Sequence, residues 1–195
     1  MVRHAKALLA GLLPAVLLAC NARAEVGTED AGGGGWYAGA AGGLLLPGNG
    51  NSLRCAGEVA VRAGRHVDDS LAFELEGVCA PNACSRAGNG AVSGVAARGL
   101  YHLSGVEFYD NLFGCERFDP FVTLGTATRF GPRHAFAGGS HRTATGPVAG
   151  LGAFYHLTDR LALRVDAQAM LCADSPCGML YSVAAGVQWS FGGDE

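Results

Sequence analysis

Apolar and polar residues alternate with a period of two along most of the chain beyond residue 34. Successive side chains of a β-strand point to opposite faces, so this alternation predicts strands with one apolar and one polar face. Turn-forming residues interrupt the alternation after about ten residues each time. Eight strands are expected, over residues 35–46, 55–65, 70–79, 91–103, 119–130, 144–157, 160–171 and 178–191.

The last two segments show the alternation most clearly. The segment over 160–171 sets Leu163 and Val165 against Arg164 and Asp166. The apolar face of the final segment carries Tyr181, Val183, Ala185, Val187, Trp189 and Phe191. This pattern fits two kinds of barrel, because a lipocalin-type barrel points its apolar face inward and a transmembrane barrel points it at lipid.

Three features favour the transmembrane barrel. The apolar face is bulky, whereas the polar face mixes Gly, Ala and Ser with ionised residues, which suits a narrow, filled lumen. Aromatic residues fall at strand ends, as an interfacial girdle requires, with Trp36, Tyr101, Tyr155 and Trp189 all expected at one end. Long connections (47–54, 79–90 and 129–143) alternate with short ones (65–70 and 156–160), the asymmetry of outer-membrane barrels. The connection over 104–118 does not fit this alternation, because it is long where a short turn is expected.

The first 24 residues have the three-part pattern of a secretory signal peptide. A basic start precedes an apolar run over residues 7–19, and Ala22-Arg23-Ala24 forms a cleavage site. The run is too short for a spanning helix. A rival interpretation treats residues 17–20 as a lipobox with Cys20 lipidated. We expect a signal peptide over 1–24, a flexible lead-in over 25–34 and the barrel over 35–192.

Six cysteines follow the predicted signal peptide: Cys55, Cys79, Cys84, Cys115, Cys172 and Cys177. An even number in an exported chain predicts disulfides rather than a zinc site. Turn-forming residues separate Cys172 from Cys177, and we expect these two to be bridged. Cys79–Cys84 ranks ahead of the alternative Cys55–Cys79, because a short loop costs less entropy to close. The pairing of Cys55 and Cys115 is left open.

Ionised residues of both signs fall on the predicted lumenal face. Leaving a charge unpaired in a narrow lumen costs several kcal/mol, so we expect a salt-bridge network that plugs the barrel. A selective or gated ion path is the alternative. The predicted network comprises Glu58, Arg62, Glu74, Glu76, Arg98, Arg129, Arg164 and Asp166.

Several short motifs resemble OmpA/OmpX-like outer-membrane barrels. Trp36-Tyr37-Ala38-Gly39-Ala40 resembles their opening strand, and Asp119-Pro120-Phe121-Val122-Thr123-Leu124-Gly125 their fifth. Residues 150–155 and 163–166 are similar to strands six and seven. Val187-Gln188-Trp189-Ser190-Phe191 resembles the closing strand, although four residues follow Phe191 here. The resemblance implies an all-β, eight-stranded antiparallel up-and-down transmembrane barrel in the cell outer membrane, in contact with its lipid and with the barrel assembly machinery.

The His102-Leu103-Ser104 sequence invites comparison with the His-x-Ser pair of outer-membrane lipid A deacylases. A base and nucleophile pair works only if a third group orients the histidine. The predicted alternation of inward and outward residues points the side chains of His102 and Ser104 into the lumen or into the turn. Gly105 also stands where that family has asparagine. We therefore expect no catalytic site.

Charge and loop composition narrow the partners further. The formal net charge is −3 and Lys6 is the one lysine, so a nucleic-acid surface is excluded. His134 and His141 suggest a solvated loop rather than a metal site, and no cofactor is expected. Arg133 and Arg142 suggest contact with lipopolysaccharide phosphates.

These observations predict a non-enzymatic outer-membrane barrel with a plugged lumen and a structural or surface-interaction role. The alternatives are an outer-membrane lipid-modifying enzyme and a soluble periplasmic ligand-carrying barrel. Retention in the membrane fraction would separate the predicted barrel from the soluble carrier.

Overall fold

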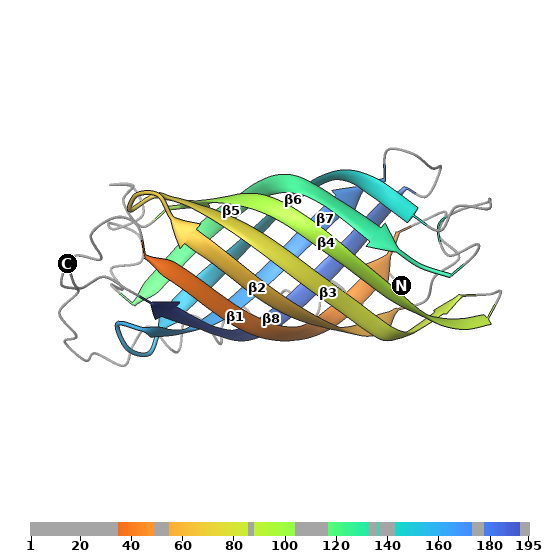
Figure 1. Cartoon of the computed structure of the whole chain (residues 1–195), viewed down its shortest axis with the longest axis horizontal. Helices are drawn as coiled ribbons and strands as arrows, with labels where there is room; N and C mark the ends of the chain where they lie inside the picture. The colour runs from red at the N-terminus through yellow and green to blue at the C-terminus, as the bar shows by residue number, and fades with distance from the viewer. Residues whose placement is uncertain are drawn as a thin grey trace.

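Eight antiparallel strands close into a barrel in which each strand pairs with its neighbours along the chain and β1 pairs with β8 (Figure 1). The computed structural model describes residues 35–48, 55–85, 88–103, 117–132, 136, 143–172 and 178–191. The strands are β1 (Trp36–Pro47), β2 (Ala56–His66), β3 (Leu71–Ser85), β4 (Gly88–His102), β5 (Phe118–Phe130), β6 (Thr143–His156), β7 (Leu161–Leu171) and β8 (Met179–Phe191). The predicted fold class is therefore confirmed. Among the described residues, no helix is long and apolar enough to cross a membrane.

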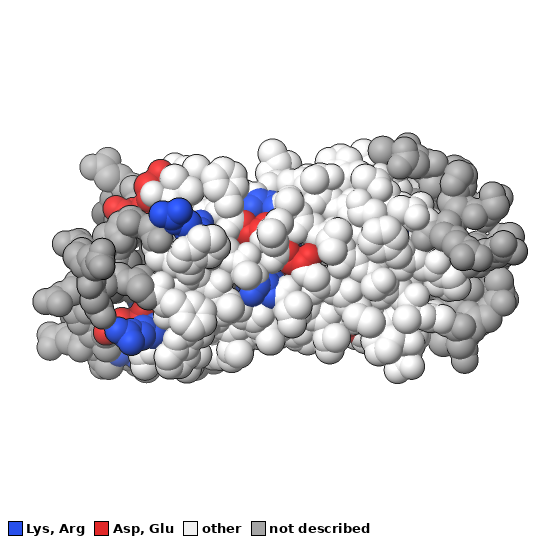
Figure 2. Space-filling view, viewed as in Figure 1, with Lys and Arg blue, Asp and Glu red and all other residues white. Residues whose placement is uncertain are grey.

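The apolar face of each strand points outward. Leu163 is 44% exposed, whereas its neighbour Arg164 is 2% exposed. Figure 2 shows a largely uncharged outer surface, with charged atoms gathered at one end and in one small patch at mid-height. An apolar exterior around a charged interior is the arrangement of a membrane barrel. The soluble carrier barrel, which would turn its apolar face inward, is excluded by this orientation.

Two tight turns mark one end of the barrel, which we call the short-turn end. The carboxylate of Asp68 accepts hydrogen bonds from the backbone N–H groups of Ser70 and Leu71, and the hydroxyl of Thr158 plays the same role before Leu161. The bonds from Ser70, and then that from Leu71, hold the pKa of the Asp68 carboxyl below its usual value. We call the opposite end of the barrel the long-loop end.

The β3–β4 hairpin corrects one predicted loop and one predicted disulfide. Residues 79–90 do not form a loop, because β3 continues to Ser85 and β4 begins at Gly88, with a register shift between Ala80 and Ala83. Cys79 and Cys84 therefore lie on one strand, about 16 Å apart at the rise of an extended chain. A disulfide needs α-carbons within about 6.8 Å. Cys79 is accordingly free, and the predicted Cys79–Cys84 bridge is wrong.

The alternative Cys55–Cys79 bridge is also wrong, since Cys55 is free. The register of β2 and β3 explains this, because Cys79 lies opposite Val59 and Cys55 is four residues before Val59. Cys172 is not free, and its N–H donates to the carbonyl of Gly178 at 3.2 Å. Gly178 has a φ of 66°, the left-handed conformation that glycine adopts without strain.

Several predictions fall on residues outside the described part of the chain. They concern the signal peptide and lead-in (1–34), Ser104 and Gly105, Cys115, Cys177, and the loop residues Arg133, His134, His141 and Arg142. The Cys172–Cys177 bridge therefore stays a prediction. The side chain of Cys84 also lies outside the described part.

Candidate functional site

The lumen of the barrel is filled in layers, and the middle layer is ionic. All eight residues of the predicted network are buried, each exposing 6% or less of its surface. They come from five strands because alternate residues of every strand point inward. Four arginines face four carboxylates, so the layer is neutral overall.

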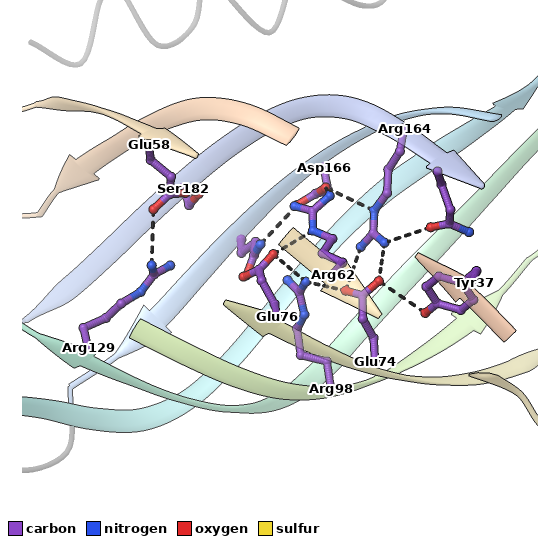
Figure 3. A network of polar contacts seen from close by, with 12 residues as sticks. Tyr37, Glu58, Arg62, Glu74, Glu76, Arg98, Arg129, Arg164, Asp166 and Ser182 are labelled. Atoms are coloured by element: carbon purple, nitrogen blue, oxygen red, sulfur yellow. Dashed lines mark hydrogen bonds and ion pairs between the residues drawn. The ribbon is translucent and has the colours of Figure 1, made fainter. Parts of the chain in front are cut away.

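Six of these residues form a closed ring of alternating charge, which we call the charge ring: Arg62, Glu76, Arg98, Glu74, Arg164 and Asp166 (Figure 3). On the β2–β4 side, Arg62 Nε donates to Glu76 Oε2 at 2.7 Å. Nη2 of Arg98 bridges two carboxylates, since it lies 2.7 Å from Glu76 Oε2 and 2.5 Å from Glu74 Oε1. Each of these side chains therefore contacts two partners of opposite charge.

The other half of the charge ring crosses the lumen to β7. Strands β3 and β7 lie four strands apart in either direction, on opposite walls. Arg164 pairs with Glu74 through both terminal nitrogens, and its Nε donates to Asp166 Oδ1 at 3.2 Å. Arg62 closes the ring on Asp166, with Nη1–Oδ1 at 2.9 Å and Nη2–Oδ2 at 3.1 Å.

Neutral polar groups complete the coordination of the carboxylates. The hydroxyl of Tyr37 donates to Glu74 Oε2 at 3.2 Å, and Gln168 Nε2 donates to Asp166 Oδ2 at 3.1 Å. Buried carboxylates are stable only when such bonds replace the lost water. Within the described part, Glu76 Oε1 and Arg98 Nε and Nη1 have no hydrogen-bond partner.

The remaining two ionised residues lie toward the long-loop end. Arg129 Nη1 pairs with Glu58 Oε2 at 3.2 Å, and the hydroxyl of Ser182 donates to the other oxygen of Glu58. Beyond this pair the lumen becomes apolar. The buried cluster there comprises Leu45, Ala56, Ala80, Ala83, Val92, Ala96, Ala127, Phe136, Ala144, Val148, Met170, Cys172 and Leu180. Phe136 comes from the β5–β6 connection and has no exposed surface.

A third layer closes the short-turn end, and we call it the histidine floor: Tyr37, His66, His102, Asp119, Phe121, Phe154 and His156. His102 Nδ1 lies 2.5 Å from Asp119 Oδ2, and its ring stacks on Phe154 with centroids 5.8 Å apart. The rings of His66 and His102 are 5.3 Å apart. The guanidinium of Arg164 lies over Phe121 and Phe154, at 4.8 and 5.2 Å, and joins this layer to the charge ring.

Glycine makes room for the aromatic rings of the floor. A β-carbon at Gly64 would lie 2.2 Å from the ring of Tyr37, and one at Gly152 would lie 2.5 Å from that of Phe121. Both distances are far below van der Waals contact. The two aromatic side chains therefore fit the lumen because the facing strand has no side chain there.

The histidine floor was not predicted from the sequence. The sequence signal for it was that β2, β4 and β6 each end on a histidine, namely His66, His102 and His156. Asp119 contacts His102, whereas Ser104 of the His-x-Ser sequence lies outside the described residues. Nor does any group of three or more His, Cys, Asp or Glu among the described residues have the geometry to hold a metal ion.

Comparison with known proteins bears on the fold alone. No family model and no curated protein sequence matches the chain. The N-terminal β-barrel domain of Pseudomonas aeruginosa OprF is similar, with a TM-score of 0.60 and 14% identity over 82% of this chain and 99% of that one. Neisserial surface protein A has a TM-score of 0.60 and 15% identity, over 81% of this chain and 97% of its own.

A third similar structure is the outer membrane protein OprG of Pseudomonas aeruginosa. Its TM-score is 0.56 and its identity 11%, over 84% of this chain and 99% of that one. The resemblance read from the short motifs is thus confirmed as a likeness of fold. The chain has the fold of the small eight-stranded outer-membrane barrels, with an apolar exterior suited to that membrane.

Proposed function

We propose that the chain is a non-enzymatic outer-membrane barrel whose lumen is closed by its own side chains, and that it has a structural or surface-interaction role. The observation that carries this proposal is the charge ring. It links β2, β3 and β4 to β7 across the lumen through six ionised groups that compensate one another.

An ion that crosses the barrel has to part the charge ring. Parting it exposes charges that are paired in the closed state, and breaking a buried pair costs about 3–5 kcal/mol. The apolar layer above the ring and the histidine floor below it add two further barriers of packed side chains. An eight-stranded barrel is just wide enough for its own side chains to fill. These features support a closed lumen rather than an ion path.

Ion conductance of the folded full chain in planar lipid bilayers tests the closed lumen. We expect conductance at the background of a protein-free bilayer at neutral pH. The variant Glu76→Ser/Arg98→Ser removes one charge of each sign, so it keeps the lumen neutral while it shortens two side chains of the charge ring. This variant should conduct more than the wild type, since it opens space within the charge ring.

A matched control makes the same change outside the lumen. Arg65 and Asp68 lie at the short-turn end, are exposed and carry opposite charges. Arg65→Ser/Asp68→Ser should therefore stay at background. Steady single-channel conductance from the wild type would overturn the proposal and favour the ion path instead.

Contacts with lipopolysaccharide and with the assembly machinery are proposals of a different kind. The first depends on Arg133 and Arg142, which lie outside the described residues. Undiminished lipopolysaccharide binding by an Arg133→Ala/Arg142→Ala variant would rule it out. The second depends on the aromatic end of β8, where Trp189 and Phe191 point outward and are 47% and 51% exposed.

A further inference from the structure

Three histidines meet at the short-turn mouth of the lumen, each at the end of a different strand. His102 is 4% exposed, His66 is half-buried, and His156 is exposed at the rim. His66 and His102 are within 5.3 Å of each other, and both His102 and His156 approach the ring of Phe154, at 5.8 and 6.3 Å. The cluster therefore runs from solvent into the floor.

Among the described residues, few negative charges face this cluster. The described titratable and charged groups around it are Tyr37 from β1, Asp68 from the β2–β3 turn, Glu74 from β3, Asp119 from β5 and Arg164 from β7. Glu74 already serves two arginines of the charge ring, and Asp68 is bound within its own turn. Asp119 is thus the one carboxylate within the floor itself.

Protonation of these histidines therefore changes the balance of charge in the floor. With neutral imidazoles the floor carries the single negative charge of Asp119. A positive charge on His102 would compensate that charge, because its Nδ1 contacts Asp119. Protons on all three histidines leave a net charge of +2 (three minus one) beside the guanidinium of Arg164, which lies on the same phenylalanine rings.

We propose that the histidine floor is an acid-sensitive closure of the short-turn mouth, closed at neutral pH and opened when protons reach His66 and His156. The open floor is hydrated and accepts these protons more readily than the packed one. In the packed floor, partial burial disfavours a charged imidazole at His66, and like charges held close together repel one another. Linkage then favours the open form as the pH falls through about 6.5, the ordinary range of histidine. This inference does not depend on whether the charge ring blocks ions.

Amide hydrogen exchange on the folded full chain in lipid nanodiscs tests this closure. Exchange is compared at about pH 7.5 and about pH 5, on either side of the histidine range, with labelling times scaled for the intrinsic pH dependence of exchange. We expect the short-turn ends of β2, β4 and β6 to exchange at least about tenfold faster at the lower pH. A histidine whose pKa is one unit higher in the open floor than in the closed floor shifts the opening equilibrium by about tenfold. The long-loop ends of the same strands should change little.

The variant His66→Gln/His156→Gln keeps the His102–Asp119 contact but removes the second and third protons. It should lose most of the acid-induced increase. His134→Gln is the matched control, because residue 134 belongs to the connection at the other end of the barrel, and it should behave as the wild type. If the double variant does not fold, His66→Gln alone should reduce the increase.

Three outcomes would overturn the inference. They are wild-type exchange at these strand ends that does not change with pH, an increase that persists in the folded glutamine variant, and an increase of equal size at both ends of the barrel. Conductance at neutral pH would instead contradict the closed lumen, so failure of one proposal is distinguishable from failure of the other.

Discussion

Replacing Arg164 by methionine is the sharpest test of the charge ring. Methionine keeps much of the length and apolar character of the side chain but removes its charge. The ring would then hold three carboxylates against two guanidinium groups, with one negative charge left without compensation. Glu74 would lose two bonds and keep those from Arg98 and Tyr37.

The expected loss of stability follows from the burial of Arg164, which is 2% exposed. Removing one partner of a buried ion pair costs about 3–5 kcal/mol. That cost includes the lost cation–π contacts with Phe121 and Phe154, each of which contributes up to about 2 kcal/mol at a desolvated site. Glu74→Gln should also destabilise the barrel, because it leaves one positive charge uncompensated. Arg164→Met/Glu74→Gln restores neutrality, so it should cost less than the sum of the two single changes by about 1–3 kcal/mol.

The free energy of unfolding can be measured by urea titration in lipid vesicles. The heat-dependent shift in gel mobility reports the folded fraction at each urea concentration. Arg65→Met is the matched control, because that arginine is exposed at the rim over Trp36. It should cost less than about 1 kcal/mol. Wild-type stability of Arg164→Met, or strict additivity in the double variant, would refute the reasoning.

Three further predictions concern the wall of the barrel. Leu124 is 70% exposed at the midpoint of β5, so Leu124→Arg should destabilise the barrel by about 2–4 kcal/mol in lipid unfolding titrations, and an effect near zero would contradict a lipid-facing position. Gly64→Ala should destabilise by about 1–3 kcal/mol, because the new methyl group meets the ring of Tyr37 at 2.2 Å; a variant as stable as the wild type would show that the ring moves freely. Peptide mapping without reductant should find Cys172 linked to Cys177, and free thiols at both positions would contradict that bridge.

The period-two pattern was sufficient to predict the strands and their faces. In β7, for example, every second residue from Ala162 to Met170 is buried. The bilayer imposes this pattern, because each outward residue must be apolar and each inward residue must fit a narrow lumen. Where a strand runs past the membrane the constraint ends, so the pattern stopped near residue 79 although β3 continues to Ser85.

Contacts across the lumen could not be predicted in the same way. The alternation of inward and outward residues along each strand places Arg62 and Asp166 inside the barrel. Whether the two side chains contact each other depends on how the strands are staggered around the barrel. Stagger is a property of the closed sheet rather than of any one segment. The histidine floor was missed for the same reason, since His66 and His102 come together only after the three strands β2, β3 and β4 have been placed in register.

The composition of the charge ring has a consequence for the route by which the barrel enters the membrane. The segment from β2 to β4 carries Arg62, Glu74, Glu76 and Arg98, two charges of each sign, and β7 carries Arg164 and Asp166, which contact each other at 3.2 Å. The ring residues of each part are therefore neutral as a set before the two parts meet, and the pairs need only exchange partners when the wall closes. Glu58 of β2 differs, because it is compensated only when Arg129 of β5 joins it. The charge ring can thus assemble in stages, with β5 completing the compensation.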